Sequence, residues 1–414
     1  MGSIPTAPTI HVITISMKFF EDTTSTYQEV GHQGYYIANG KNFQYRYSAY
    51  LEATKANSDV KWNFNNEVYK TVNWSKPLNR TLPDLYRERA QQLRDKYDYL
   101  ILSYSGGSDS DTVLHAFIDN GIHIDEVWVD WPRHMMEKVN WNATSANKDH
   151  TNLASEWHFT TEPKLRELHA QHPEIKIHVS DCTSGGPEHE VDDANGLTDL
   201  RNTYFYGRRR QYMCDYQHKL FDQGLSSAVI LGIDKPSITV INDNIYARFV
   251  DEPIRFRTDI AAYQHSVVEF FYWTPDSPYM VVNQIHEILQ YLQRNFGEFQ
   301  RLENFLRTNV NWNQRANNLD TVTNTVCYPN WKPAFQTDKT HGQFEHQQFH
   351  SLLVPFVNTE RFAKFFHHRW YEDHNLLRPD LLVYINGVCC GTKSQINTYP
   401  VMSLDKFYQG VQRV

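Results

Sequence analysis

Short apolar runs alternate with amphipathic stretches between residues 99 and 231. Four runs have a strand-like composition, at residues 100–104, 126–130, 175–179 and 228–231. Helical patterns lie between them, including residues 112–118, closed by Asn120-Gly121, and residues 199–223. Such alternation predicts a parallel sheet with helices on its faces, joined by right-handed crossovers. We therefore expect a doubly wound α/β fold that binds its ligand beyond the carboxyl ends of the strands.

The first 80 residues have a pattern that is mainly β. Residues 9–15 alternate between apolar and polar side chains. Residues 35–47 predict a hairpin around Asn39-Gly40, a dipeptide that favours the tight turn of two antiparallel strands. We expect an N-terminal β-rich segment before the α/β region.

A helix is predicted to begin near residue 81, just before the parallel sheet. Thr81 precedes it, and Pro83 lies in its first turn, where proline is tolerated. Its apolar side chains recur at helical spacing and share one face. They are Leu82, Leu85, Tyr86, Ala90 and Leu93.

Beyond residue 231 the pattern changes to hairpins and helices. Hairpins are predicted at residues 238–249 and 381–388, and helices at 281–296, 298–308 and 358–375. Gly297 is expected to stop the first of these helices. Its apolar face comprises Val281, Ile285, Ile288, Leu289, Leu292 and Phe296. We divide the chain into an N-terminal β-rich segment (1–80), an α/β domain (81–275) and a C-terminal helical and hairpin region (276–414).

Composition narrows the class of protein. With 414 residues, 40% of them hydrophobic and 21% charged, the chain is expected to fold as a soluble globule. It has no apolar run of about 18 residues and no signal-peptide pattern, so we expect a cytoplasmic protein without a membrane partner. The net charge of −8 does not favour broad nucleic-acid binding. Self-association is left open.

The most informative motif is Ser105-Gly106-Gly107-Ser108-Asp109-Ser110, between the strand at 100–104 and the helix at 112–118. Its two glycines let backbone N–H groups approach a phosphate, and the positive end of the helix dipole favours negative charge. The motif therefore predicts an anion site. The alternative is an ordinary turn, in which Asp109 and Ser110 only cap the helix.

This stretch resembles the SGGxDS loop of the PP-loop ATP pyrophosphatases, which include asparagine, GMP and NAD synthetases, tRNA thiolation enzymes and phosphoadenylylsulfate reductases. The resemblance covers about residues 80–275 and implies a Rossmann-like PP-loop (HUP-type) domain that uses ATP and Mg²⁺. Asp109 would be a magnesium ligand. The nucleotide would be bound by Ser103, Ser105, Gly106, Gly107, Ser108, Asp109 and Ser110.

A second element follows the strand at 228–231. Gly232, Asp234 and Lys235 resemble the GTxDKSE element of the NAD synthetase-like members, although Ile233 and Pro236-Ser237 depart from it. By this resemblance Gly232 would lie at the nucleotide, Lys235 would stabilise the leaving pyrophosphate, and Asp234 would help to hold Mg²⁺. A cation is needed where negative charge accumulates. A surface turn is the competing interpretation.

Two further candidates are less specific. Asp130 ends the strand at 126–130, where the family has a polar residue near the ribose, but it could equally be a turn residue. Arg208, Arg209 and Arg210 lie in the helix predicted at 199–223. They could bind an anionic substrate, or they could form a solvated helix face.

Cysteines and histidines are weaker candidates. The five cysteines contain no CxxC pair, which argues against a disulfide framework and a four-cysteine zinc site. Cys182 and Cys214 could act as nucleophiles in sulfur transfer, although buried inert thiols are commoner. Cys389-Cys390 match the sulfate-reductase motif poorly. His341, His346 and His350 are spaced so that they could bind a metal ion on a helix, but solvated histidines are the more frequent case.

Our leading hypothesis is an Mg²⁺-dependent enzyme in which a substrate oxygen attacks the α-phosphate of ATP. Pyrophosphate leaves, and a nitrogen nucleophile, less readily sulfur, then displaces AMP. Alternatives are nucleobase or tRNA thiolation, a sulfonucleotide reductase-like reaction, and a non-catalytic nucleotide-binding protein. The overall pattern is similar to PP-loop proteins of large tailed bacteriophages, labelled asparagine synthase-like or sulfate reductase-like. The acceptor substrate is not identified.

Overall fold

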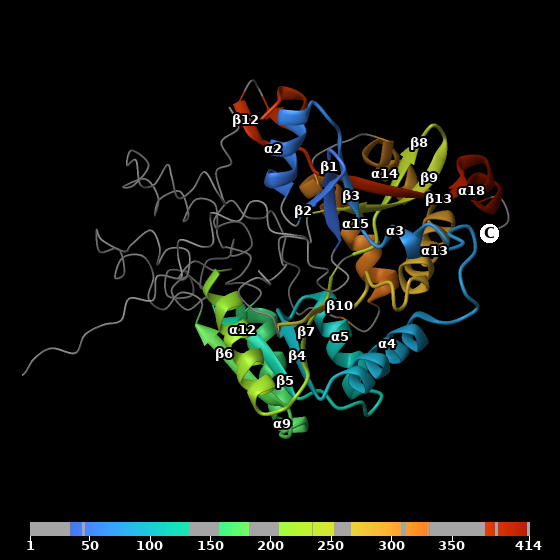
Figure 1. The fold of residues 1–414 in the computed structure, drawn as a ribbon. Coiled ribbons are helices and arrows are strands. Elements are labelled where there is room, and N and C mark those ends of the chain that lie inside the picture. The colour runs from blue at the N-terminus through green and yellow to red at the C-terminus, as the bar shows by residue number, and fades with distance from the viewer. Residues whose placement is uncertain are drawn as a thin grey trace, which may run out of the picture.

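The computed structural model describes residues 34–43, 46–131, 157–181, 207–233, 235–251, 266–307, 312–328, 331, 377–385 and 388–411. Figure 1 shows two groups of elements. A parallel sheet with its helices lies at the bottom of the view, and antiparallel sheets with further helices lie at the top. The strands predicted at 9–15 and the helix predicted at 358–375 fall outside the described residues.

The parallel sheet has five strands in the order β10-β7-β4-β5-β6. They are β4 (Tyr99–Tyr104), β5 (Glu126–Trp131), β6 (Lys176–Asp181), β7 (Ser227–Leu231) and β10 (Val268–Phe270). The four predicted strands are confirmed, and β10 is an addition. The chain builds the sheet outward from β4 to β6 and then returns to the other side of β4 with β7. This order is compatible with a Rossmann-like fold, and it reverses between β4 and β7.

Helices cover both faces of this sheet. One face packs with α4 (Leu82–Lys96), α5 (Ser108–Ile118) and α9 (Glu162–Gln171) in the main core. The other face packs against α12 (Gly207–Asp222), where Ile101 and Trp128 of the sheet meet Met213 of the helix. Since side chains alternate along a strand, β4, β5 and β7 each contribute side chains to both cores.

The predicted start and apolar face of α4 are confirmed. The Thr81 hydroxyl accepts a hydrogen bond from the backbone N–H of Asp84, and Pro83 lies in the first turn. All five predicted apolar side chains are buried: Leu82, Leu85, Tyr86, Ala90 and Leu93. The periodicity of the sequence was therefore sufficient to orient this helix.

The N-terminal part forms a small antiparallel sheet. Its elements are β1 (Tyr35–Ala38), β2 (Lys41–Phe43), α2 (Arg46–Ala56), β3 (Val60–Asn63) and α3 (Asn66–Tyr69). The predicted hairpin is confirmed, with Asn39 at φ 49° and Gly40 at φ 70°. The second strand of the hairpin was predicted too long, because Arg46 and Tyr47 belong to α2.

A second antiparallel sheet has the order β13-β9-β8 and is bordered by helices. Its strands are β8 (Ile238–Ile241), β9 (Asn244–Val250) and β13 (Ile396–Ser403). The neighbouring elements are α13 (Tyr279–Arg294), α14 (Phe296–Arg307), α15 (Trp312–Cys327), the 3-10 turn Pro379–Leu381, β11 (Leu382–Ile385), β12 (Val388–Thr392) and α18 (Leu404–Val411). Both hairpins predicted in this part are confirmed.

The end predicted for the helix at 281–296 is wrong. The helix α13 ends at Arg294, and Asn295 is its C-cap, with φ −115° and ψ 60°. Phe296 begins α14, and Gly297 lies inside the first turn of α14. The break is therefore at Asn295, whose side-chain amide donates to the Tyr291 carbonyl.

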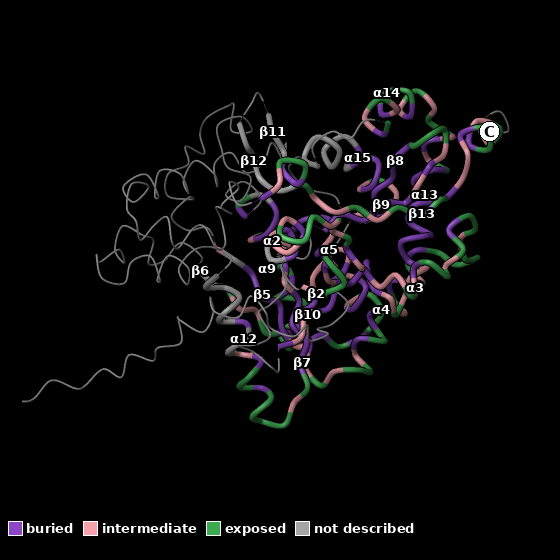
Figure 2. The backbone as a smooth tube through the Cα atoms, turned by 45° about the horizontal axis from the view of Figure 1, so that its top comes forward, coloured by how far each residue is buried: buried purple, intermediate pink, exposed green. Residues whose placement is uncertain are grey.

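One aromatic cluster joins the N-terminal sheet to the β13-β9-β8 sheet. Trp62 of β3 stacks on Phe64 with ring centroids 4.8 Å apart, and Phe64 lies 5.3 Å from Phe249 of β9. Figure 2 shows buried residues in the elements of both groups. The division at residues 80 and 275 stays a prediction, although β9 pairs with β13 across the second boundary.

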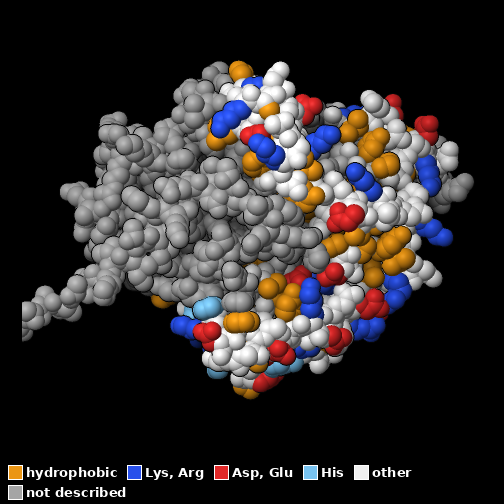
Figure 3. Space-filling model, viewed as in Figure 1, with side chains coloured by type: hydrophobic (Ala, Val, Ile, Leu, Met, Phe, Trp, Pro, Cys, Tyr) orange, Lys and Arg blue, Asp and Glu red, His pale blue; other side chains and the backbone are white. Residues whose placement is uncertain are grey.

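The helices and the surface charges can be compared with the features expected of membrane-bound and nucleic-acid-binding proteins. Within the described part of the chain, no helix is both long and apolar enough to cross a membrane. On the described portion of the face in Figure 3, Lys and Arg side chains are interspersed with Asp and Glu. That mixture does not form the single basic stretch typical of a nucleic-acid footprint on this face.

Candidate functional site

The Ser105–Ser110 motif forms the connection between β4 and α5, as predicted. Gly106 has a φ of +80°, which L side chains rarely adopt, and Gly107 is the N-cap of α5. The Ser105 hydroxyl accepts from the N–H of Gly107 at 3.2 Å and lies 3.2 Å from the Ser110 hydroxyl. The N–H of Ser105 also donates to the Ser110 hydroxyl. These bonds fold the loop into a tight turn at the helix N-terminus.

The loop is held in a largely buried position. Gly106, Gly107 and Ser108 are buried, whereas Ser105 is exposed. The Asp109 side chain is 27% exposed, so it is the acidic group through which the loop reaches solvent. Because the first N–H groups of any helix lack intrahelical acceptors, this end of α5 attracts an anion.

The chain after β7 meets this loop at the point where the strand order reverses. A Cβ atom on Gly232 would lie 3.0 Å from the carbonyl carbon of Asp109 and 3.1 Å from the nitrogen of Ser110. Only a glycine allows so close an approach. The ammonium group of Lys235 lies 4.0 Å from the Asp109 carboxylate. The structure therefore brings Gly232 and Lys235 beside the motif, and their roles stay predictions.

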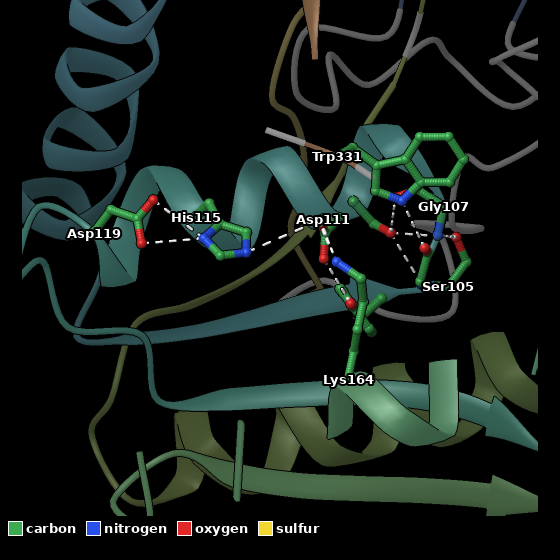
Figure 4. A network of polar contacts seen from close by, with 10 residues as sticks. Ser105, Gly107, Asp111, His115, Asp119, Lys164 and Trp331 are labelled. Carbon is green, nitrogen blue, oxygen red and sulfur yellow. Dashed lines mark hydrogen bonds and ion pairs between the residues drawn. The ribbon is translucent and has the colours of Figure 1, made fainter. Parts of the chain in front are cut away.

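Two residues of the region around α9 support the loop, and neither was anticipated. Figure 4 shows one of them, Lys164, beside Asp111. Thr161 ends a π-helix (Trp157–Thr161), and its hydroxyl donates to the Ser105 carbonyl at 2.6 Å. Lys164 in α9 pairs with the buried Asp111 carboxylate at 2.6 Å, and the Tyr104 hydroxyl donates to the same carboxylate. Thr161 lies 56 residues from the loop, so no local pattern indicated it.

The end of α15 and the residues after it also contact the loop. They lie beyond residue 275, outside the part of the chain that resembles the PP-loop family. The Ser108 hydroxyl donates to Asn324 at 2.9 Å. The indole N–H of Trp331 donates to the Gly106 carbonyl at 3.2 Å, and Figure 4 shows its ring against the loop. Tyr272 lies two residues after β10, and its hydroxyl donates to the Asp109 carbonyl at 2.9 Å. These partners lie more than 160 residues from the loop in sequence.

Several predicted residues cannot be assigned to the site from the structure. Ser103 lies in β4, two residues before the loop. Asp234, Cys182, and the histidines at 341, 346 and 350 fall outside the described residues. The structure describes the backbone but not the side chains of Asp130, Arg208, Arg209, Arg210, Cys214, Cys389 and Cys390. Their roles stay predictions.

Cys327 is a free cysteine near the motif, but its environment suppresses its reactivity. The thiol is fully buried at the end of α15. Burial raises its pKa well above the ordinary value, and the negative charges of Glu287 and Asp109 act in the same direction. A thiol in this setting stays protonated, whereas the thiolate is the nucleophile.

The described donors fit Mg²⁺ held together with a nucleotide. Asp109 offers a partly exposed carboxylate, with the Ser108 hydroxyl 3.5 Å from one of its oxygens. Mg²⁺ commonly binds through one or two carboxylates while phosphate and water oxygens complete its shell. Among the described residues, no three His, Cys, Asp or Glu side chains group into a site that would hold a metal by themselves.

A cavity of about 880 Å³ lies beside α5 rather than in front of its N-terminus. It is bounded by the start of α4, by Thr112 and His115 of α5, and by His286 of α13. Trp331 lines this cavity and also contacts the loop. The glycines, the helix N-terminus and Lys235 converge at the loop and not at this cavity, so the loop is the candidate anion site.

In comparisons with known proteins, no protein-family model and no curated protein matches the chain. The geometry of the loop and its neighbours therefore carries the function proposed below.

Proposed function

We propose that the chain is an Mg²⁺-dependent ATP pyrophosphatase that adenylates a substrate oxygen with release of pyrophosphate, after which a nitrogen nucleophile bonds to the substrate and displaces AMP. One observation carries this proposal. The SGGSDS loop at the end of the central strand β4 meets Gly232 and Lys235 where the strand order reverses. In doubly wound sheets, that crevice is where nucleotides bind.

The local charges suit cleavage at the α-phosphate. In the proposed step, a substrate oxygen forms a bond to the α-phosphorus, and the bond to the bridging oxygen of the β-phosphate breaks. Pyrophosphate leaves with the electron pair, and the Lys235 ammonium stabilises its added charge. The N-terminus of α5 binds phosphate oxygens. When bound, Mg²⁺ would neutralise phosphate charge next to Asp109.

Nitrogen is favoured over sulfur as the second nucleophile. A sulfur route through a protein thiol needs a thiolate, and burial keeps protonated the one cysteine side chain that the structure describes, Cys327. The proposed partners are therefore ATP, a carboxylate- or carbonyl-bearing acceptor and an amine or ammonia. A cytoplasmic location is part of this proposal, since the reaction consumes ATP.

The test is product analysis. The protein is incubated with ATP, Mg²⁺ and a metabolite extract, and AMP and pyrophosphate are measured. The double variant Ser108→Ala/Asp109→Asn should lose both products. The variant Asp119→Asn, changed at the exposed C-terminal end of the same helix, should keep them. Formation of ADP and phosphate would refute adenylation, and ATP binding without any turnover would make the chain a nucleotide-binding protein instead.

A further inference from the structure

The side chain of Tyr328 is fully buried, and its hydroxyl has no hydrogen-bond partner among the residues that the structure describes. Tyr328 directly follows α15, and its carbonyl accepts from the backbone N–H of Trp331, whose indole contacts Gly106. Its ring lies 5.6 Å from the ring of Tyr272, whose hydroxyl bonds to the Asp109 carbonyl. Two of its neighbours therefore contact the motif directly.

An unpaired buried hydroxyl is uncommon because it loses its bonds to water and gains nothing in return. Burial raises the pKa of Tyr328 well above the ordinary value, and among the charged groups the Asp109 carboxylate has the largest effect. The phenol therefore stays protonated, and it can donate a hydrogen bond to an anion.

We propose that Tyr328 is a ligand-binding residue whose hydroxyl donates to a phosphate oxygen of a nucleotide held by the Ser105–Ser110 loop. This proposal depends on the proposed function, since it assumes a polyphosphate at the loop. It gives the C-terminal region a direct part in nucleotide binding. The hydroxyl, unpaired among the described side chains, is then explained as a donor kept for the ligand.

The chain supplies a matched control. Tyr69 is also fully buried, and within the described part of the chain its hydroxyl also lacks a partner. Tyr69 packs in the aromatic cluster with Phe64, Trp74 and Phe249, away from the motif. If an unpaired hydroxyl were only a packing defect, Tyr69 and Tyr328 should respond alike to the loss of their hydroxyls.

The experiment compares Tyr328→Phe with Tyr69→Phe and the unaltered protein. Thermal unfolding is measured without ligand, and calorimetric titration is carried out with Mg²⁺–ATP and with pyrophosphate. Without ligand, both variants should unfold at or above the temperature of the unaltered protein, because each loses an unsatisfied group. Tyr328→Phe should bind both probes about tenfold to one-hundredfold more weakly, the range for a hydrogen bond to a charged group. Tyr69→Phe should bind them unchanged.

Three outcomes would overturn this inference. Equal affinities of Tyr328→Phe and the unaltered protein would remove the contact with the ligand. A lowered unfolding temperature of Tyr328→Phe without ligand would show that its hydroxyl already has a structural partner. Failure of the unaltered protein to bind either probe would overturn the proposed function, and with it this role of Tyr328.

Discussion

Substitution of Gly232 by alanine tests whether the chain after β7 lies in close contact with the Ser105–Ser110 loop. The new Cβ would lie 3.0 Å from the Asp109 carbonyl carbon, 3.1 Å from the Ser110 nitrogen and 3.2 Å from the Asp109 Cβ. Carbon atoms in good contact are about 3.5–4.0 Å apart, so the gap must open by roughly half an ångström. Two of the three contacted atoms belong to the backbone, so the start of α5 itself has to move.

The expected cost follows from overpacking. Inserting a methyl group into a packed site costs about 1–3 kcal/mol, and the lower entropy of the unfolded alanine chain offsets about 0.4–1 kcal/mol of this. We expect a net loss of about 0.5–2 kcal/mol in the free energy of unfolding. Because catalysis is sensitive to displacements below 1 Å, we also expect at least about a tenfold loss of AMP formation.

Gly297→Ala is the matched control. A Cβ at Gly297 meets nothing within 4 Å, and the residue lies in the first turn of α14. Alanine there should leave stability unchanged or raise it by about 0.5–1 kcal/mol. The assays are thermal unfolding of both variants and AMP formation from Mg²⁺–ATP. If Gly232→Ala is as stable as Gly297→Ala and equally active, the close approach of β7 and the loop is refuted.

Three further predictions concern the loop and the response to pH. Lys235→Gln should lower kcat/KM for AMP formation by about 100-fold or more, since a charge donor at the leaving group is lost; an unchanged rate in a pyrophosphate-release assay would exclude Lys235 from that role. Thr161→Val leaves the Ser105 carbonyl without its 2.6 Å donor and should cost about 1–3 kcal/mol in unfolding experiments; equal stability would show that the bond is dispensable. Burial lowers the pKa of His286, and the charge of Lys406 has a smaller effect in the same direction. As pH falls, the imidazole is therefore protonated in the unfolded chain before it is protonated in the folded protein. Stability should therefore decline below about pH 6.5, and less so in His286→Gln, whose amide can still donate to the Trp74 carbonyl; identical pH profiles would contradict this.

Local patterns were sufficient for much of the fold. The strands β4 to β7 and the buried face of α4 follow directly from apolar spacing, because burial on a strand or helix face repeats with a short period. The Asn39-Gly40 turn was equally predictable, since few other residues accept positive φ at both positions.

Boundaries that depend on packing were not predictable in the same way. The sequence pattern runs on into Phe296 and suggests a stop at Gly297, but α13 already ends at Arg294. Both helices are amphipathic, so periodicity cannot locate the break between them. The strand β10 has only three residues and forms by pairing with β7, a contact that no short-range signal encodes.

The sequence by itself determined the chemistry at the centre of the candidate site. The glycine-rich loop, the acid at Asp109 and the cation at Lys235 are recognisable because each directly follows a strand of the predicted sheet. Only the tertiary structure decided what surrounds them. Thr161, Asn324, Tyr328 and Trp331 come from distant segments. Their contacts depend on how whole helices pack against the sheet, and no periodicity along the chain carries that information.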